Sequence, residues 1–358
     1  MAQIEVVQAG LAVAIQDPGR FGLRRLGVPL SGASDPVLLA LANALAGNDP
    51  GAAALEVPLS GPTLAVRSGT VRFALAGPIG ATVQGAAADG ADALRAVAPW
   101  STVTLAAGET LAVGAVAAPS AQNRLAIAYV AVAGGIDVAP VLGSRSTYAR
   151  ALLGGVNGRA LAAGDLLPCA DFARAQVQER RGPAPFAHAD APIRVIAGPQ
   201  SENFEPAALQ TLAGADFSVS RDSDRMGLRL SGPRLPHGAL GADIASDGVT
   251  PGAIQVPADG QPIVLMADCQ TVGGYPKIAT VIRADLPRLA HLRPGATLRF
   301  QLVSLAQASA ARRDLAEQIA AWVGRIAPFS ADGHIDEAAL YAGNLVSGMV
   351  RADPVDLP

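Results

Sequence analysis

The chain has 358 residues, of which 50% are hydrophobic and 16% are charged, whereas about 25% charged residues are usual in globular proteins. Disordered proteins show the opposite balance, so the composition excludes an intrinsically disordered chain. A net charge of -3 and an aromatic content of 4% provide neither the basic surface nor the stacking rings of a nucleic-acid-binding protein. At about 150 residues per domain, the length corresponds to two domains with an appendage.

The rare residue types exclude several kinds of site. Lys277 is the only lysine and is followed by Ile278, so the chain has no Walker A loop for ATP. The same lysine does not lie in the Met-Lys-Met setting of biotin carriers, so no covalently bound cofactor is expected. The cysteines, Cys169 and Cys269, and the scattered histidines form no metal-binding or disulfide pattern.

No segment has the properties of a membrane span or a secretory signal. The longest uncharged run, 73–88, is interrupted by Gly and Pro and is shorter than a transmembrane helix requires. The first residues lack a basic region and place Glu5 within the first apolar stretch, unlike a signal peptide. We therefore expect a cytoplasmic protein that does not bind membranes.

In chain order, the sequence predicts short strands separated by Gly or Pro, a spacing typical of β-barrels and sandwiches. One early helix is predicted, with Asp35 as its N-cap, Pro36 in its first turn and Gly47 at its end. The clearest strands are expected at 4–7, 71–76, 102–105, 124–132, 193–197, 262–267, 277–282 and 297–302.

These patterns divide the chain into four parts and predict a mainly β (α+β) fold. We expect an N-terminal β-barrel lobe over 1–175 and a C-terminal lobe over 193–304. Between them, 176–192 is predicted to be a linker, because this segment contains Gly and Pro and its apolar residues show no regular spacing. The last part, 305–358, is predicted to be a helical tail.

The tail has one helical face. Leu315, Ile319, Trp322 and Ile326 recur at steps of four, three and four residues, which places them on one side of a helix. A second short helix is expected at 338–345. A tail of this kind packs on the body of the protein or on a partner.

Two segments share the pattern D-x-x-R-x-G-L-R. The first runs from Asp17 to Arg24 and the second from Asp222 to Arg229. Each copy lies near the start of one predicted lobe, which favours two related lobes that form a pseudo-symmetric body.

The densest polar segment, 243–277, contains the main candidate for catalysis. Gly273 and Gly274 allow a ligand to approach the backbone closely, and in an extended chain Tyr275 and Lys277 project to the same face. An ammonium beside a phenol could stabilise negative charge on a carbonyl oxygen, and the use of arginine everywhere else indicates that this position requires an ammonium. The alternative is a solvated lysine at an edge turn. Polar residues that interrupt the same segment are Ser246, Asp247, Gln255, Asp268, Gln270 and Thr271.

A second polar cluster lies near the N-terminus. Gln16, Arg20 and Ser31 could line a cleft and bind a carboxylate, which the planar fork of arginine bonds bidentately. The alternative is structural, with Asp17 and Arg20 paired across a turn and Asp35 acting only as a helix cap.

Two further charged residues have open interpretations. Glu56 is flanked by apolar residues in a predicted strand; it is either a base with a raised pKa or, as we favour, part of a solvated strand face. Arg225 either binds a substrate or forms a bridge with Asp224.

Longer stretches around these residues resemble a known family, that of the C subunit of 5-oxoprolinase, also called allophanate hydrolase subunit 2 and biotin-dependent carboxyltransferase family protein. The similarity extends from about residue 4 to residue 302. The stretches that carry it are IQDPGRFGLRRLGVPLSGASD (15–35), LANALAGN (41–48), LEVPLSGP (55–62), VIAGPQSENF (195–204), SDRMGLRLSG (223–232), SDGVTPGAIQVPADGQPIVLMAD (246–268) and QTVGGYPKIATVIRADL (270–286).

The resemblance implies a fold of two cyclophilin-like β-barrel lobes and a place in a heteromeric complex. In the prokaryotic 5-oxoprolinase, the A, B and C subunits together cleave the lactam of 5-oxoproline to glutamate at the expense of ATP. The B and C subunits together resemble the carboxyltransferase domain of urea carboxylase. Other relatives of B and C act as an inhibitor of a sporulation kinase and its antagonist.

Roles follow from the positions that match the family's motifs, with Val272 as a small departure where Thr is expected. Catalytic roles are implied for Lys277, Tyr275 and Gln270. Contacts with substrate are implied for Gln16, Arg20, Ser31, Arg225, Gln255, Gly273 and Gly274, and supporting roles for Asp17, Asp35 and Asp247; no metal is expected.

Three functions therefore remain open. The first is the C subunit of an ATP-dependent 5-oxoprolinase that acts with the A and B subunits, where ATP is used by the complex. The second is a carboxyltransferase that moves CO2 from carboxybiotin on another protein, with Gln255 or Gln270 contacting the ureido group. The third is a non-catalytic antagonist that binds a kinase-inhibitor-like B subunit.

Overall fold

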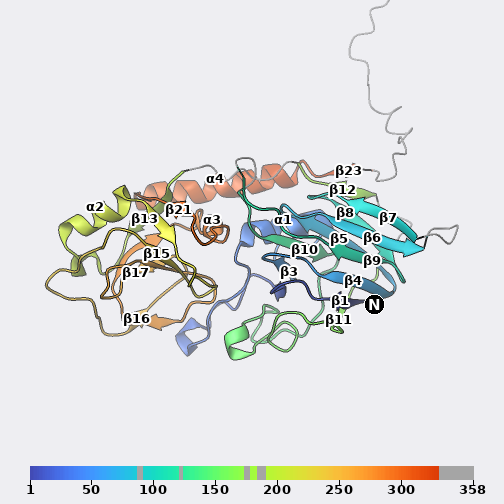
Figure 1. Ribbon diagram of the computed structural model, residues 1–358, viewed down its shortest axis with the longest axis horizontal. Coiled ribbons are helices and arrows are strands. Elements are labelled where there is room, and N and C mark those ends of the chain that lie inside the picture. The colour runs from blue at the N-terminus through green and yellow to red at the C-terminus, as the bar shows by residue number, and fades with distance from the viewer. Residues whose placement is uncertain (87–91, 121–123, 173–177, 184–190, 330–358) are drawn as a thin grey trace, which may run out of the picture.

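Short, mostly antiparallel strands dominate both halves of the chain, as Figure 1 shows for the computed structural model. The structure describes residues 1–86, 92–120, 124–172, 178–183 and 191–329. The expected mainly β fold with barrel lobes is confirmed. The short helix expected at 338–345 lies outside the described residues. Within the described ranges, no helix is both long and apolar enough to span a membrane.

The N-terminal lobe is built from two sheets that enclose an apolar core. In β1, Ala2, Ile4 and Val6 are buried while alternate residues are more exposed, as the period of two in a strand requires. The first sheet has the order β11 (Leu166–Cys169), β1 (Ala2–Gln8), β4 (Thr63–Ser68), β9 (Thr110–Val113), β6 (Ala81–Ala86), β7 (Asp92–Val97). The second has the order β2 (Ala14–Gln16), β3 (Ala54–Val57), β10 (Ala128–Val132), β5 (Thr70–Ala76), β8 (Thr102–Ala106).

Helix α1 (Pro36–Ala46) covers the outer face of the second sheet. Its N-cap is Asp35, whose Oδ1 accepts hydrogen bonds from the amides of Val37 and Leu38 at 2.8 and 2.9 Å. Gly47 ends the helix with a φ of 85°, a conformation that glycine adopts without steric cost. The prediction of this helix and of its cap is confirmed. Because α1 lies on the sheet, the second sheet is buried on both faces.

The C-terminal lobe is a closed barrel of seven strands when β21 and β22, which follow each other in the chain, are counted as one. Its sheet has the order β21 (Thr297–Leu298), β14 (Phe217–Val219), β15 (Gly227–Ser231), β18 (Ile263–Leu265), β17 (Ala253–Gln255), β20 (Lys277–Val281), β13 (Ile193–Ala197), β22 (Phe300–Leu302). Since only Arg299 separates β21 from β22, the two ends of this order meet and the sheet closes. Phe217 and Phe300 pack inside, with ring centroids 6.0 Å apart.

Smaller elements decorate the two lobes. The two-stranded antiparallel sheet of β16 (Asp247–Gly248) and β19 (Val272–Gly273) projects from the C-terminal barrel and carries part of the predicted site. The short helical elements are η1 (Arg24–Leu26), η2 (Ala149–Ala151), η4 (Ser201–Asn203), α2 (Pro206–Gly214) and α3 (Leu286–Leu289).

Helix α4 (Leu305–Val323) bridges the two lobes, along the top of Figure 1. A capping box of Ser304 and Gln307 begins it. Its first half packs on the C-terminal lobe through Ala311, while its second half reaches α1 through Trp322. The predicted apolar face is therefore confirmed for Leu315, Ile319 and Trp322, which contact both lobes. Ile326 lies beyond the end of the helix, so the described part of the tail is helical only as far as Val323.

The chain after α4 continues onto the N-terminal lobe. There β23 (Ala327–Phe329) pairs with β12 (Glu179–Arg181). The described part of the expected linker thus contains a strand that helps to hold the tail. Trp322 lies edge-on to Trp100, with ring centroids 5.5 Å apart and an interplanar angle of 64°.

The strongest polar contact between the lobes is made by Arg225, from the loop before β15. Its guanidinium donates to both oxygens of Asp268 in its own lobe at 2.9 and 3.0 Å. Across the interface it donates to Glu56 at 2.5 Å, to the hydroxyl of Ser34 at 2.6 Å and to the carbonyl of Gly32 at 2.6 Å. These five contacts use all five N–H groups of the side chain. Arg225 is therefore placed in the interlobe contact, where no donor is left for a substrate.

The neighbouring carboxylates favour the charged form of Arg225. Burial by itself lowers the pKa of Arg225, but the carboxylates of Glu56 and Asp268 outweigh it, and the net shift of the pKa is upward. Burial, followed by the charges of Glu56 and Asp35, raises the pKa of Tyr129, which donates its hydroxyl proton to Glu56. Glu56 is thus buried and fully bonded, and its interpretation as part of a solvated strand face was wrong.

His291 makes a second buried contact between the lobes. The amide of Ala126 donates to its Nδ1 at 3.0 Å, and its Nε2 lies 2.9 Å from Oδ2 of Asp35. Because Nδ1 accepts, the ring proton resides on Nε2 and is donated to Asp35. One carboxylate therefore caps α1 and also binds the opposite lobe.

Removing the indole of Trp322 will destabilise the protein through lost packing at the bridge. Truncation of a buried aromatic side chain costs about 3–5 kcal/mol, so Trp322→Ala should lower the free energy of unfolding by that order in urea denaturation. Val323→Ala, on the exposed side of the same turn, is the control and should be nearly neutral. Equal effects of the two variants would contradict a bridging role for α4.

Replacing Arg225 will leave two buried carboxylates without a cation. Loss of one member of such a cluster costs about 3 kcal/mol or more, so Arg225→Gln should markedly lower the thermal midpoint. Arg229→Gln changes an exposed arginine nearby on β15 and should have little effect. A stable Arg225→Gln variant would show that the lobes do not depend on this contact.

Candidate functional site

Lys277 lies at the start of β20, beside the two-stranded sheet of β16 and β19. Its side chain is almost fully buried, and its Nζ donates to Oδ2 of Asp247 at 2.5 Å and to the carbonyl of Gly248 at 3.0 Å. An ammonium has three donors, so one remains after these two contacts. The lysine is therefore a fixed, charge-paired group rather than a freely solvated one.

Gln200 completes the surroundings of this ion pair. Its Nε2 donates to Oδ2 of Asp247 at 3.1 Å, while its Oε1 accepts from the backbone amide of Lys277 at 3.3 Å. The hydrogen bond from Lys277, followed by those from Gly248 and Gln200, lowers the pKa of Asp247. Because the Asp247 side chain is 53% exposed, the pair is open to solvent and to ligands on that side.

Two glutamines, Gln255 and Gln270, lie beside the two-stranded sheet of β16 and β19. Nε2 of Gln255 donates to the carbonyl of Tyr275 at 3.1 Å, and Nε2 of Gln270 donates to Oε1 of Gln255 at 3.4 Å. A Cβ atom on Gly273 would lie 2.6 Å from Nε2 of Gln255, so a side chain at this position would displace the amide of Gln255. The structure thus brings together Lys277, Asp247, Gln255, Gln270 and Gly273, as expected for one site.

Tyr275 occupies a different environment from Lys277. Its side chain is 41% exposed, whereas Lys277 is 3% exposed. β20 begins only at Lys277, so the extended geometry assumed for the two side chains does not extend back to Tyr275. Gly274, the preceding residue, accepts a hydrogen bond from the amide of Ile244 at 2.9 Å. Tyr275 lies on the rim of the site, and its assignment as catalytic stays a prediction.

The N-terminal cluster forms a separate, buried network. Oδ1 of Asp17 accepts from the hydroxyl of Ser144 and Oδ2 accepts from the amide of Arg145, each at 2.6 Å. Arg20, which is 1% exposed, donates to the hydroxyl of Ser146 at 2.9 Å, to its carbonyl at 2.6 Å and to the carbonyl of Val141 at 3.2 Å. Burial lowers the pKa of Arg20, and the charge of Asp17 opposes that shift.

Gln16 and Ser31 belong to the same network. Nε2 of Gln16 and the hydroxyl of Ser31 both donate to the carbonyl of Thr147, at 3.2 and 3.1 Å. Together with Asp17 and Arg20, they tie the segment 14–32 to the loop 141–147. The structure therefore does not bring these four residues to Lys277. It supports a structural role for the cluster, but Asp17 and Arg20 bond to the loop 141–147 rather than to each other.

Arg24, which the sequence interpretation did not select, connects the two regions. From η1 in the N-terminal lobe, its Nη2 donates to the carbonyl of Val249 and, at 3.1 Å, to that of Gln270. Its Nη1 is buried and has no hydrogen-bond partner. The repeated D-x-x-R-x-G-L-R pattern contains Arg24 at its last position, and this was the available signal.

The cluster around Lys277 can bind an anionic or developing negative oxygen. The ammonium retains one donor, and a buried, oriented donor stabilises such an oxygen far better than water does.

Among the described residues, no group of three or more His, Cys, Asp and Glu side chains is placed to hold a metal ion. Cys269 is buried, and burial raises the pKa of its thiol, which disfavours a thiolate nucleophile.

Comparison with known proteins agrees with this architecture. Residues 26–302 match the family model described as carboxyltransferase domain, subdomain A and B. The chain is 38% identical to the C subunit of 5-oxoprolinase from Escherichia coli, over 87% of its own length and 94% of that protein.

Two solved structures share the fold. The urea carboxylase of Kluyveromyces lactis superposes with a TM-score of 0.75 at 29% identity, over 92% of this chain and 30% of that one. The protein TTHA0988 superposes with a TM-score of 0.68 at 32% identity, over 85% of this chain. This chain spans only 56% of TTHA0988, so both solved proteins contain additional parts. With its barrel fold, its family match and its near full-length similarity, the chain belongs to the family of 5-oxoprolinase C subunits, which are carboxyltransferase-domain proteins.

Proposed function

We propose that this chain is the C subunit of an ATP-dependent 5-oxoprolinase, which opens the lactam of 5-oxoproline to L-glutamate together with the A and B subunits. The observation that carries the proposal is the extent of the similarity. The chain matches nearly the whole length of the E. coli 5-oxoprolinase C subunit, whereas it matches a minor part of the larger urea carboxylase. The similarity therefore corresponds to a whole subunit in the first protein and to one segment of a multidomain enzyme in the second.

The chemistry of the substrate explains why a complex with ATP is proposed. A lactam carbonyl is a poor electrophile, and phosphorylation of its oxygen by ATP activates the carbonyl carbon towards water. After water adds, the ring C–N bond breaks with the protonated amine as the leaving group, and hydrolysis of the resulting acyl phosphate releases phosphate and leaves the carboxylate of glutamate. No Walker A sequence occurs in this chain, so the proposal assigns the use of ATP to the complex. In this chain, the remaining donor of Lys277 would bind the carbonyl-derived oxygen, because Asp247 and Gly248 hold the ammonium in place.

A carboxyltransferase function is the second candidate, and the family match supports it. In that reaction the same polar cluster would face carboxybiotin carried by another protein. Gln255 and Gln270 present amide groups beside Lys277, and amides can pair with the ureido group of biotin. The chain would then contact a biotinylated carrier rather than 5-oxoproline.

The proposed partners can be tested by purifying this chain from its own host at native expression and identifying associated proteins by mass spectrometry. The 5-oxoprolinase proposal expects A-type and B-type subunits. A biotinylated carrier or biotin carboxylase in their place would favour carboxyl transfer. A B-type subunit accompanied by a histidine kinase, without an A-type subunit, would support the non-catalytic antagonist.

Removing the ammonium of Lys277 should abolish turnover without unfolding the chain. In the reconstituted complex, Lys277→Ala should lower 5-oxoproline-dependent glutamate formation about 100-fold or more, the usual cost of losing one oriented donor to a developing charge. The thermal midpoint and co-purification of the variant serve as checks on folding and assembly.

Asp247→Asn is the matched variant, since it removes the counter-ion but keeps the lysine. It should reduce turnover less than Lys277→Ala does. Because Lys277 lowers the pKa of Asp247, the pair is charged above that lowered pKa and loses its charge only as the pH falls through it. Glutamate formation by Lys277→Ala at the wild-type rate would exclude Lys277 from the site.

A further inference from the structure

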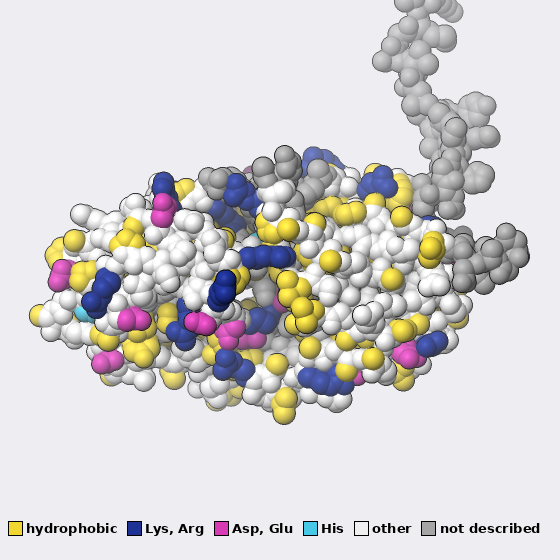
Figure 2. Space-filling model, viewed as in Figure 1, with side chains coloured by type: hydrophobic (Ala, Val, Ile, Leu, Met, Phe, Trp, Pro, Cys, Tyr) yellow, Lys and Arg dark blue, Asp and Glu magenta, His cyan; other side chains and the backbone are white. Residues whose placement is uncertain are grey.

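A cleft between the lobes lies apart from the Lys277 cluster and has a distinct chemistry. It has a volume of about 520 Å³, within the range of roughly 300–1,000 Å³ typical of small-molecule sites. Figure 2 shows the surface hollowed between the lobes, with basic side chains along the upper edge of the hollow and acidic ones along its lower edge. Segments from the N-terminal lobe, the C-terminal lobe and α4 all line the cleft.

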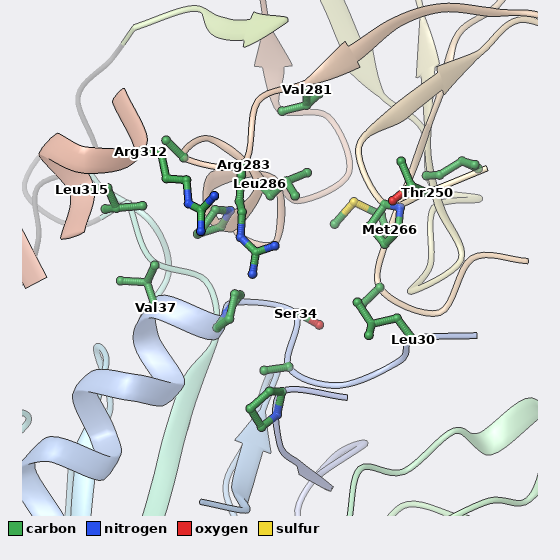
Figure 3. Close-up of a pocket in the computed structure, with 18 of the residues that line it drawn as sticks. Leu30, Ser34, Val37, Thr250, Met266, Val281, Arg283, Leu286, Arg312 and Leu315 are labelled. Atoms are coloured by element: carbon green, nitrogen blue, oxygen red, sulfur yellow. The ribbon is translucent and has the colours of Figure 1, made fainter. Parts of the chain in front are cut away.

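Two arginines reach into this cleft from different elements. Arg283 follows β20, and Arg312 lies on α4; Figure 3 shows both guanidinium groups extending into the same open space. Within the part of the chain that the structure describes, neither side chain has a hydrogen-bond or ion-pair partner, and no Asp or Glu lines the cleft. Two guanidinium groups in one cleft whose lining residues include no carboxylate give the cleft a positive potential, which favours an anionic ligand.

The backbone offers little to an anion here, although the N-terminus of α1 borders the cleft. The amides of Val37 and Leu38 already donate to Asp35, and the amide of Ser34 donates to Glu56 at 2.7 Å. The positive end of the helix is therefore satisfied by the protein itself. Anion recognition in the cleft depends on the two guanidinium groups.

The remaining walls are predominantly apolar. Leu30 comes from the N-terminal lobe, Val281 and Leu286 come from the C-terminal lobe, and Leu315 comes from α4. Inorganic phosphate would satisfy the arginines but would leave these walls in contact with water. A carboxylate fits the planar fork of arginine bidentately, and an apolar body attached to it would cover the walls.

We propose that this interlobe cleft is a binding site for a small organic monocarboxylate with a compact apolar body, held by Arg283 and Arg312. The inference does not depend on the 5-oxoprolinase activity. It adds a ligand site that is separate from Lys277 and that closes around parts of both lobes and α4.

Isothermal titration calorimetry of the full chain with cyclohexanecarboxylate tests the proposal. Wild-type protein should bind this probe saturably, and saturation should raise the thermal midpoint, as for any ligand that binds only the folded state. Arg283→Gln and Arg312→Gln should each weaken binding about tenfold or more, the usual effect of losing a charge-assisted hydrogen bond. Both side chains are exposed and lack protein partners among the described residues, so these variants should fold normally.

Three controls make the result specific. Arg313→Gln changes an exposed arginine on α4 that does not line the cleft and should leave binding unchanged. Lys277→Ala should also bind the probe normally, which separates failure of this inference from failure of the proposed function. Cyclohexanecarboxamide, the neutral analogue, should not bind. Equal binding of the amide, equal or tighter binding of inorganic phosphate, insensitivity to both arginine variants or no saturable binding would each overturn the proposal.

Discussion

The relative position of the two lobes depends on one guanidinium group, that of Arg225. Glu56 belongs to the N-terminal lobe and Asp268 to the C-terminal lobe, and both carboxylates are shielded from water. Two buried negative charges would repel each other and would lack hydration, so neither lobe could close on the other without a cation between them. Arg225 supplies that cation: three of its five N–H groups bond the two carboxylates, and the other two bond the hydroxyl of Ser34 and the carbonyl of Gly32. The interface is specific because its geometry must match this fork.

The bridge made by α4 is a second, physically different constraint. Arg225 fixes the lobes through charge and hydrogen bonds, whereas Trp322 fixes the end of α4 through apolar contact with Trp100 and α1. The two attachments lie at different places along the junction, and the cleft lies between α4 and the lobe surfaces. Arg312 is therefore held at the cleft by a helix that is anchored on both sides. A flexible tail would not keep its guanidinium directed at Arg283.

The sequence was sufficient to predict those elements whose signals come from residues that are close together in the chain. The Asp35 cap, Pro36 and Gly47 defined α1, and the spacing of Leu315, Ile319 and Trp322 defined the face of α4, because capping and periodicity depend on near neighbours. The grouping of Lys277 with Asp247, Gln255 and Gln270 was also predictable, since β16, β17, β19 and the start of β20 all derive from the segment 243–277. Glu56 was misinterpreted because strand alternation assumes one exposed face, whereas every residue of β3 is buried. Helix α1 covers that strand, and this contact between two elements cannot be read from the residue pattern of the strand alone.

Contacts between distant segments could not be derived in the same way. Arg225 was assigned to substrate because its pattern resembles a site motif, but its partners Glu56 and Ser34 come from the other lobe. Arg312 carries no local signal in a chain where arginine supplies 26 of the 27 basic Lys and Arg residues, and Arg24 is marked only by the repeated D-x-x-R-x-G-L-R pattern. The role of an arginine can be inferred only when its partners are known. Arg20 and Arg225 donate to acceptors within the protein. Arg283 and Arg312 have no such acceptors among the residues that the structure describes.

The geometry of β20 separates the two candidate ligand sites. Lys277 stands at its first residue and Val281, which lines the cleft, at its last. Four steps along a strand cover about 13 Å, and the strand is held on both sides by β17 and β13, so this separation is not adjustable. Lys277 therefore belongs to one end of this strand and the cleft to the other. The cleft and the lysine cluster can bind different molecules or separate groups of one larger molecule. The same barrel strand that positions the ammonium also prevents the two sites from merging.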